Sequence, residues 1–386
     1  MRKLSFCFGS SRQAATWHPA LMDVGELLIK LETPIRTTET TAQYHRMTKA
    51  EKEVIKDKGG FLAGTLKGTR RKKTDVVSRS MVTLDCDKLN VGFFDEYELM
   101  NAFYSIVYTT HSHMPEAPRA RILMPLTRDV TPEEYNAIAR YLADEIGMAM
   151  IDPCSFKINQ LMYWANCPSD GEYICRVYEG DWLDPDAYLG AHPNWKDCAS
   201  LPVAPAERET MERDRKKQED PLAKTGIVGT FCRAYSIPEV IDKYLSDVYA
   251  PTDKEGRYDY IPGEGSSGVV VYEDRFVYSH HATDPAGGKL LNAFDLVRAH
   301  LFDDDDPKKS FNEMAEFAAR DERVQALGLE ERTVRAGEDF AEPDDEDDDD
   351  WKKKLVRQKK STQLENSLFN ICLLYTSPSP RDAHES

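Results

Sequence analysis

The chain has 386 residues, of which 41% are hydrophobic and 10% aromatic. This composition supports real hydrophobic cores and excludes a wholly disordered chain. No apolar run approaches the roughly 18–20 residues that span a bilayer. The N-terminus also lacks the apolar segment of a secretory signal. We therefore expect a cytoplasmic protein with no membrane segment.

The net charge of −17 argues against nucleic-acid binding if it is taken as one number for the whole chain. The charge is unevenly spread, because ten acidic residues and no basic residue lie between Glu338 and Asp350. The rest of the chain carries only −7. A local basic surface that binds nucleic acid is therefore compatible with the sequence.

Shifts in composition divide the chain into two apolar units and charged segments. We expect a first unit over residues 1–200, a charged linker over 201–224 and a smaller α+β unit over 225–330. Residues 331–371, acidic and then basic, are predicted to be a disordered tail. Residues 372–386 resemble the translation of a sequencing adapter, so we expect that the native gene continued beyond about residue 370.

The first unit alternates short β-rich runs with helical patterns. Predicted strands cover residues 81–84, 105–109, 121–124 and 160–164, and predicted helices cover 94–103 and a segment that opens at residue 131. Thr131-Pro132-Glu133-Glu134 is a capping box with proline at the first helical position, which marks the start of the second helix. The order β-α-β-β-α-β is that of the split βαβ, ferredoxin-like (RRM-like) arrangement of an α+β fold.

Asp85-Cys86-Asp87 closes the first of these strands. Side chains alternate along a strand, so Asp85 and Asp87 point the same way and Cys86 points to the other face. Two neighbouring carboxylates repel each other unless a cation lies between them, and their hard oxygen atoms suit Mg²⁺ or Mn²⁺ holding a triphosphate. The alternative is an ordinary surface turn, which also carries Asp-x-Asp.

Further polar residues follow at the next strand ends. The second strand ends in a segment with His111 and His113, and the topology brings its end close to the two acids. A histidine there can donate to a phosphate oxygen, unless it only caps or fills the core. Arg119 and Arg121 open the next strand at positions i and i+2, so both guanidinium groups suit phosphate on one face. An exposed edge-strand role is their alternative.

The loop before the last strand adds two candidates. Asp152, which follows Ile151, offers a third carboxylate for the metal site, and Lys157 offers a phosphate contact. Asp-Pro favours turns, so a capping role for Asp152 is the alternative.

A glycine-punctuated basic loop precedes the first strand. Such a loop beside a metal centre predicts contacts with template DNA or a triphosphate, whereas in isolation it is typical of a solvated charge run. Its candidate DNA-binding residues are Lys67, Arg70, Arg71, Lys72, Lys73 and Arg79.

Taken together, three short motifs make the chain resemble the archaeo-eukaryotic primase superfamily, the primase–polymerases. They are hydrophobic-Asp-x-Asp at Leu84–Asp87, small-x-His at Thr109–His111 and hydrophobic-Asp at Ile151–Asp152. The chain more specifically resembles the N-terminal part of phage and mobile-element primase–helicases of the virulence-associated protein E family. The strings that carry this resemblance are SRSMVTLDCD (78–87), YTTHSHMPEAPRARILMPLTRDVTPEEY (108–135), QLMYWANCP (160–168), GIVGTFCRAYSIPEVI (226–241) and VVVYEDRFVYSHHATDPAGGKLLNAFDLVRAH (269–300).

The resemblance implies a primase palm and a metal-dependent nucleotidyltransferase that makes or extends primers on single-stranded DNA from nucleoside triphosphates. It implies that Asp85, Asp87 and Asp152 hold Mg²⁺ or Mn²⁺ and that His111 contacts the triphosphate. His113, Arg119 and Arg121 would support that contact. It also implies a replicative helicase partner. The chain carries no Gly-x4-Gly-Lys-Ser/Thr motif, which agrees with an ATPase encoded further downstream.

Two other function classes compete with this interpretation. Rolling-circle replication endonucleases have a related fold with a His-hydrophobe-His metal motif and a tyrosine nucleophile, and His111-Ser112-His113 is similar to that motif. Its middle residue is serine, however, and Asp-x-Asp would have no role. A catalytically inactive palm that only binds DNA or a helicase is the second alternative. The four retained motif residues, Asp85, Asp87, Asp152 and His111, speak against it.

The second unit offers one further candidate site. His280 and His281 lie near Asp284. The structural alternative is a β-hairpin packed on a helix over Asn292–His300, with the histidines serving the fold.

Overall fold

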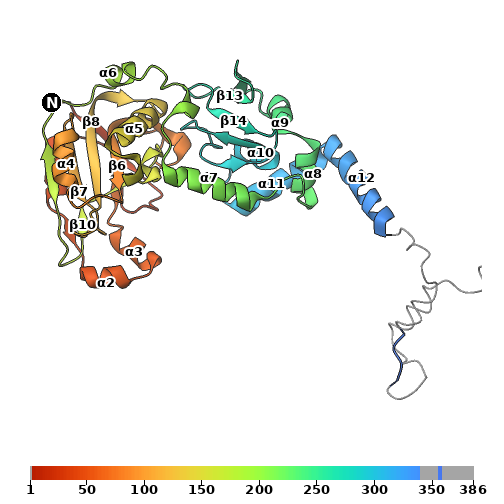
Figure 1. The fold of residues 1–386 in the computed structure, drawn as a ribbon, viewed down its shortest axis with the longest axis horizontal. Coiled ribbons are helices and arrows are strands. Elements are labelled where there is room, and N and C mark those ends of the chain that lie inside the picture. The colour runs from red at the N-terminus through yellow and green to blue at the C-terminus, as the bar shows by residue number, and fades with distance from the viewer. Residues whose placement is uncertain (1, 340–354, 359–386) are drawn as a thin grey trace, which may run out of the picture. The chain divides into compact units, whose positions relative to one another are not determined.

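The computed structural model describes residues 2–339 and 355–358 (Figure 1). Residues 1–325 form one compact unit and residues 326–386 form a second one. The boundaries predicted at residues 200 and 225 both fall within the first unit. Most of the predicted disordered segment 331–371, and all of the adapter-like segment 372–386, lie outside the described residues. Residues 331–339 differ from the expectation, because they belong to helix α12 and are rich in the helix formers Glu, Arg and Ala.

A five-stranded antiparallel sheet forms the centre of the first 200 residues. Its strand order is β11-β7-β8-β6-β5. The strands are β5 (Gly64–Leu66), β6 (Val76–Cys86), β7 (Ser105–Thr109), β8 (Ala120–Val130) and β11 (Cys175–Tyr178). The middle strands β6 and β8 are apolar over most of their length, because both faces of the sheet are covered.

Two hydrophobic cores lie on the two faces of this sheet. Val82 and Leu84 of β6 belong to the core that helices α4 (Phe93–Met100) and α5 (Pro132–Ile146) complete. Met81 belongs to the second core, which contains residues of the N-terminal sheet and of helix α1 (Val24–Glu32). The alternation of neighbouring side chains along β6 explains this division.

The predicted capping box starts α5 as expected. The Thr131 hydroxyl accepts a hydrogen bond from the Glu134 amide, and the Glu134 carboxylate accepts one from the Thr131 amide. Pro132 occupies the first turn, where its missing N–H costs nothing. With β6, α4, β7, β8 and α5 in chain order and β7-β8-β6 in space, the α+β split βαβ core is confirmed.

The last predicted strand, 160–164, forms differently from the expectation. Only β9 (Met162–Tyr163) is extended, and it pairs with β4 (Gly60–Leu62) in the N-terminal sheet of order β2-β1-β4-β9. At the end of β6, a single antiparallel bridge joins Cys86 to Ile151 instead. The segment after α5 contains Pro153 and the two 3₁₀ turns η2 (Met148–Met150) and η3 (Pro153–Phe156), so no long strand forms there.

The N-terminal region adds further short strands and helices. It contains β1 (Leu4–Gly9), β2 (His18–Met22), α2 (Thr41–Arg46), α3 (Lys49–Lys56) and the 3₁₀ turn η1 (Lys73–Asp75). A short parallel pair joins β3 (Ile35–Arg36) to β10 (Asn166–Cys167), which ties the segment before α2 to the segment after β9. Helix α6 (Pro185–Gly190) and the turn η4 (Cys198–Ser200) follow β11.

Helix α7 (Pro205–Gln218) fills most of the predicted linker. Arg140 of α5 donates to both carboxylate oxygens of Glu207, so a pair of hydrogen bonds attaches α7 to α5. Glu133 at the start of α5 accepts a hydrogen bond from Thr283, and Thr131 donates to Glu264. The regions before and after the predicted linker are therefore joined by polar contacts.

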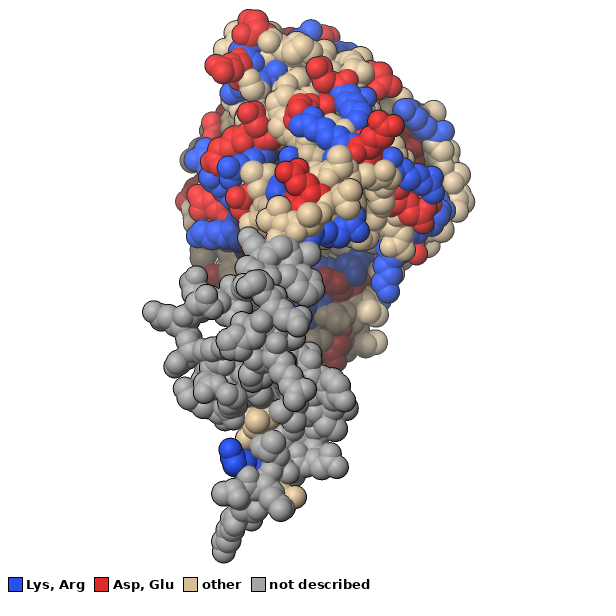
Figure 2. Space-filling model, turned by 90° about the vertical axis from the view of Figure 1, so that its right-hand side faces the viewer, with Lys and Arg blue, Asp and Glu red and all other residues tan. Residues whose placement is uncertain are grey.

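The region after α7 is a second α+β region with a sheet of its own. An antiparallel meander runs in the order β12-β13-β14-β15-β16. Its elements are α8 (Gly226–Ala234), α9 (Ile237–Tyr244), β12 (Tyr249–Pro251), β13 (Arg257–Tyr260), β14 (Val269–Tyr272), β15 (Phe276–Ser279), β16 (Leu290–Leu291), α10 (Ala293–Leu301), α11 (Pro307–Arg320) and α12 (Glu322–Asp339). On the face drawn in Figure 2, acidic and basic side chains are interspersed, so the visible part of this face has no patch of one sign.

The histidine pair of this region serves the fold. His281 accepts the Tyr260 amide through Nε2, and its Nδ1 lies 3.8 Å from the Cys198 sulfur. The buried Asp284 accepts from Tyr249 and pairs with His300. The predicted hairpin is β14–β15, and α10 begins after the Asn292 cap. These contacts favour the structural alternative over a second site.

Two further observations concern the residues that the structure describes. No helix among them is long and apolar enough to cross a membrane. Their seven cysteines are all free thiols.

The burial of His280 predicts loss of stability in acid. Burial lowers the pKa of His280 to about 4, against about 6.5 in an unfolded chain. The folded state therefore binds fewer protons, and its stability falls as the pH drops from about 6.5 towards 4. We expect a loss of about 2 kcal/mol from this group between pH 7 and pH 5. Urea unfolding of the wild type and of His280→Gln at the two pH values measures the difference.

The control for this prediction is His18→Gln, which alters an exposed histidine. The pH dependence of stability should be flatter for His280→Gln than for the wild type and for His18→Gln. Equal pH dependence in all three proteins would contradict a half-buried, neutral His280.

Candidate active site

Three acidic residues from two separate segments of the chain, Asp85 and Asp87 on one and Asp152 on the other, line one pocket at the end of β6. The Asp152 amide donates to the Asp85 carbonyl at 2.8 Å, and the Asp87 amide donates to the Met150 carbonyl at 3.0 Å. These bonds attach the loop after α5 to the end of the first motif. They place the three acids in one pocket, called here the strand-end pocket. It is lined by Lys56, Asp85, Asp87, Thr110, His111, Ser112, Arg119, Arg121, Asp152, Tyr163 and Asn166.

Asp85 lies in surroundings that disfavour its charged form. Its Oδ1 is buried and has no hydrogen-bond partner. Burial raises the pKa of Asp85, the charge of Arg121 opposes this, and the charges of Asp87 and Asp152 raise it further. A buried carboxylate oxygen without a partner costs folding free energy, so it calls for a function.

The donor set of the pocket fits a hard divalent cation. Carboxylate oxygens are the ligands that Mg²⁺ and Mn²⁺ prefer, and the unpartnered Oδ1 of Asp85 lies among two further carboxylates. Among the residues that the structure describes, no three His, Cys, Asp or Glu side chains are gathered closely enough to hold a metal ion. The chemistry of the residues, rather than a preformed coordination shell, supports the fit.

Asp152 has two roles in the structure. Its Oδ1 accepts a hydrogen bond from the Cys154 amide at 2.8 Å and caps the 3₁₀ turn η3. The same residue lines the strand-end pocket. The capping role and the predicted metal-site role of Asp152 are therefore compatible, since one carboxylate oxygen is sufficient for the cap.

Both predicted arginines line the pocket. Arg121 is 8% exposed, and its guanidinium lies 5.7 Å from the Tyr108 ring centroid and 5.6 Å from that of Tyr163. Its Nε is 3.5 Å from the carboxylate of Asp85. Arg119 is 41% exposed and lies 3.3 Å from the Asp87 carboxylate. Two guanidinium groups at i and i+2 thus lie beside the acids, one near two aromatic rings and one at the exposed side of the pocket.

His111 is enclosed by protein groups. Its Nε2 lies 2.9 Å from Oε1 of Glu39, and its Nδ1 contacts Oδ1 of Asn166. The ring of Tyr44 packs on it with centroids 4.5 Å apart. Burial lowers the pKa of His111, while the hydrogen bonds with Glu39 and Asn166 act in the opposite direction. In this conformation neither ring nitrogen is left to contact a phosphate.

Two predicted nucleotide contacts lie outside the pocket lining. His113 is buried, and its Nδ1 accepts the Arg119 amide at 3.3 Å. It therefore supports the backbone beside Arg119. Lys157 is exposed, and its ammonium lies 3.7 Å from the Cys154 sulfur.

The predicted basic loop divides into exposed and structural residues. Lys67 is exposed, and Arg70 and Lys72 both pair with Asp305 at 2.7 Å. Arg71 stacks on Trp17 and donates to the backbone carbonyls of Arg12 and Asn159. These contacts leave Lys67, Arg70 and Lys72 as the accessible part of the loop.

The prediction that Arg79 contacts DNA is wrong, because its side chain is fully buried. It donates to the Ala63 and Ile158 carbonyls and to the Thr83 hydroxyl. Lys73 also differs from the expectation. Its ammonium donates to the carbonyls of Asp284 and Gly287, so it joins η1 to the loop between β15 and β16.

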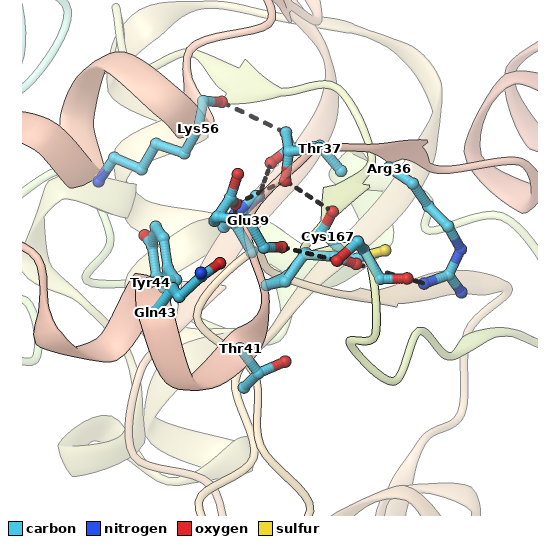
Figure 3. Close-up of polar contacts among 12 residues, drawn as sticks. Arg36, Thr37, Glu39, Thr41, Gln43, Tyr44, Lys56 and Cys167 are labelled. Atoms are coloured by element: carbon cyan, nitrogen blue, oxygen red, sulfur yellow. Dashed lines mark hydrogen bonds and ion pairs between the residues drawn. The ribbon is translucent and has the colours of Figure 1, made fainter.

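Sequence reasoning missed four residues around the pocket. Lys56, Tyr163 and Asn166 line it, and Glu39 lies behind His111. Figure 3 shows the surroundings of Glu39, with Thr37 bound both to Glu39 and to the Cys167 carbonyl. The parallel pairing of β3 with β10 brings the segment that contains Glu39 close to Asn166 and Cys167. No local sequence pattern predicts this pairing.

Comparison with known proteins gave two findings. A family model described as the VapE N-terminal domain matches residues 1–204. No curated protein matches the chain. Among solved structures, the AEP domain (PP-N190) of the cyanophage S-2L primase–polymerase (PrimPol) aligns with a TM-score of 0.28 and 11% sequence identity, covering 49% of this chain and 88% of that one.

Proposed function

The chain belongs to the family defined by the VapE N-terminal domain, and on that premise we propose that it is a metal-dependent DNA primase–polymerase. It would join nucleoside triphosphates on a single-stranded DNA template, either starting or extending primers. The observation that carries this proposal is the meeting of Asp85, Asp87 and Asp152 with two arginines in one pocket. Carboxylates for cations beside guanidinium groups for phosphates are what phosphoryl transfer needs.

Asp85, Asp87 and Asp152 would hold Mg²⁺ or Mn²⁺. When bound, the ions would make the primer 3′-hydroxyl a better nucleophile and neutralise charge on the departing pyrophosphate. The partnerless Oδ1 of Asp85 supports this assignment most directly. The cap that Asp152 provides to η3 keeps its backbone against Asp85.

The remaining chemistry belongs to the side chains of the palm. Arg121, held between Tyr108 and Tyr163, would offer N–H donors in a fixed direction to a phosphate oxygen. Arg119, at the exposed side of the pocket, would follow the triphosphate as it enters. Fixed and mobile donors together would align the α-phosphate with the attacking hydroxyl.

The two alternative functions have less support. The nitrogens of His111 face Asn166 and Glu39, and Nδ1 of His113 accepts a backbone amide. They are not presented as a pair of metal ligands, as a rolling-circle endonuclease requires. A palm that only binds DNA would have no reason to retain the unpartnered Oδ1 of Asp85.

The wider setting is part of the same proposal. The helicase partner, the phage or mobile-element context and the cytoplasmic location would follow from the family, and a helicase would supply the single-stranded template.

The proposal is tested with the full chain, a single-stranded template, labelled nucleotides and Mg²⁺ or Mn²⁺, with and without a primer. We expect products whose sequence copies the template. A covalent 5′-phosphotyrosine adduct would instead identify the endonuclease. DNA binding without product would identify a binding module.

Template binding by the basic loop predicts an effect of Asp305. Arg70, Lys72 and Asp305 are 61%, 43% and 64% exposed, and an ion pair this exposed contributes only about 0–1 kcal/mol. Phosphates of a template can therefore displace Asp305. We expect Asp305→Asn to raise affinity for a single-stranded oligonucleotide about two- to threefold at low salt, with a smaller gain at high salt.

Fluorescence anisotropy over a salt series measures this change. Asp253→Asn removes an exposed acid that is not paired with the basic loop and serves as the control. Equal affinities of the two variants would exclude Arg70 and Lys72 as template contacts.

A further inference from the structure

One positively charged side chain of the strand-end pocket comes from a helix that carries none of the three primase-like motifs. Lys56 is the last residue of α3, and it lines the pocket together with Arg119 and Arg121. Its ammonium lies 5.8 Å from the centroid of the Tyr163 ring, and the Arg121 guanidinium lies 5.6 Å from the same centroid. Tyr163 is thus flanked by two positive groups that belong to different parts of the chain.

Lys56 differs from the two arginines in its charge partners. Arg119 lies 3.3 Å from Asp87 and Arg121 lies 3.5 Å from Asp85. Within the part of the chain that the structure describes, no carboxylate lies within ion-pair distance of the Lys56 ammonium. Its charge is therefore available to an anionic ligand without first breaking an ion pair.

The end of α3 is held in place by a chain of buried polar groups. The Asn166 side-chain amide donates to the Lys56 carbonyl at 3.3 Å, and the other end of that amide contacts His111. His111 in turn contacts Glu39. Asn166, His111 and Glu39 are 3%, 4% and 8% exposed, so solvent does not compete for these contacts.

Glu39 is itself fixed by its surroundings. Its Oε1 accepts a hydrogen bond from the Thr37 hydroxyl at 2.6 Å, and its carbonyl accepts from the Ser169 amide and hydroxyl, each at 2.9 Å. Burial opposes the charge of Glu39, but hydrogen bonds from Thr37 and His111 outweigh it and lower its pKa. In Figure 3 the Lys56 side chain extends away from this cluster.

We propose that Lys56 binds the triphosphate of the incoming nucleotide and that Glu39, acting through His111 and Asn166, is a positioning residue for Lys56. The proposal rests on the proposed function for the identity of the ligand. It replaces a direct His111–phosphate contact with a structural link, since both ring nitrogens of His111 already face protein oxygens. Lys56 of α3 would then be the third positively charged side chain at the triphosphate, beside Arg119 and Arg121.

The test measures binding rather than turnover. Isothermal titration of the full chain with inorganic tripolyphosphate and with dATP, in Mg²⁺ and without DNA, gives dissociation constants. Lys56→Met keeps the length of the side chain and removes its charge, and we expect affinity for both ligands to fall about tenfold, as for a lost charged hydrogen bond. Lys56→Arg should recover part of the loss. Lys49→Met, on the same helix at an exposed position outside the pocket, should stay within about twofold.

The role of Glu39 is tested by a double-mutant cycle. If Glu39 acts through Lys56, Glu39→Ala should weaken tripolyphosphate binding, and Glu39→Ala/Lys56→Met should bind no more weakly than Lys56→Met alone. Glu39→Gln, which retains an acceptor for His111, should restore binding. Additive losses, or no rescue by glutamine, would overturn the positioning role and leave Glu39 as a purely structural residue.

The outcomes separate this inference from the proposed function. If the wild type makes primers but Lys56→Met binds tripolyphosphate as Lys49→Met does, the inference fails alone. If the wild type binds tripolyphosphate through Lys56 but makes no product, the inference stands and the proposed activity fails. No tripolyphosphate binding by the wild type would overturn the inference.

Discussion

Replacing Asp85 by asparagine is expected to reduce nucleotide incorporation on the order of a thousandfold or more, because a metal-holding carboxylate is removed. The same substitution should not destabilise the metal-free protein. Burial and the charges of Asp87 and Asp152 raise the pKa of Asp85, so the charged carboxylate is costly in the fold. Primer extension and urea unfolding, measured on the same preparations, test both expectations.

A metal-binding readout makes this prediction independent of activity. Mg²⁺ should raise the thermal midpoint of the wild type and have a smaller effect on Asp85→Asn, since a ligand that binds only the folded state stabilises it. Asp95→Asn alters an exposed acid paired with Arg176 and serves as the control. A large loss of stability in Asp85→Asn, with activity lost only in proportion, would mean that Asp85 is structural.

Arg79→Met is expected to destabilise the protein by about 3–5 kcal/mol, because it removes three buried hydrogen bonds and leaves the Ile158 carbonyl without its donor. The Arg79 guanidinium satisfies two backbone carbonyls and the Thr83 hydroxyl, and it lies 4.0 Å from the centroid of the Tyr135 ring. Methionine fills similar space but donates no hydrogen bond. The shift in the urea midpoint measures the effect.

The matched control is Arg176→Met, which removes a half-exposed arginine from an exposed ion pair and should cost under about 1 kcal/mol. If Arg79→Met stayed as stable as the wild type but lost affinity for single-stranded DNA, the buried position of Arg79 would be contradicted. The original prediction from the charge run would then be restored.

The parts of the palm that the sequence predicted are those fixed by local patterns. The β-rich run before Asp85, the capping box at Thr131 and the i, i+2 spacing of Arg119 and Arg121 each depend on neighbouring residues only. Asp152 was predicted from its place in the chain order, and the backbone bond to Asp85 accounts for its position in the pocket.

The errors and omissions come from contacts between distant segments. Arg79 belongs to a run of basic residues, and a fully buried arginine is rare enough that a solvated or DNA-binding role was the natural expectation. β9 pairs with β4, while β5 occupies the edge of β6 beside which the last strand was expected. Glu39 and Lys56 reach the site through β3, β10 and α3, and a glutamate or a helix-terminal lysine has no local signature of that placement.

The most direct test of the account is a crystal structure of the full chain with Mn²⁺ and a non-hydrolysable nucleoside triphosphate. We expect anomalous scattering from Mn²⁺ beside Asp85 and Asp87, with the triphosphate in the strand-end pocket next to Arg119, Arg121 and Lys56. A nucleotide bound elsewhere, or a strand-end pocket without Mn²⁺ while the crystal contains it at other carboxylates, would contradict the claim that this pocket is the catalytic centre.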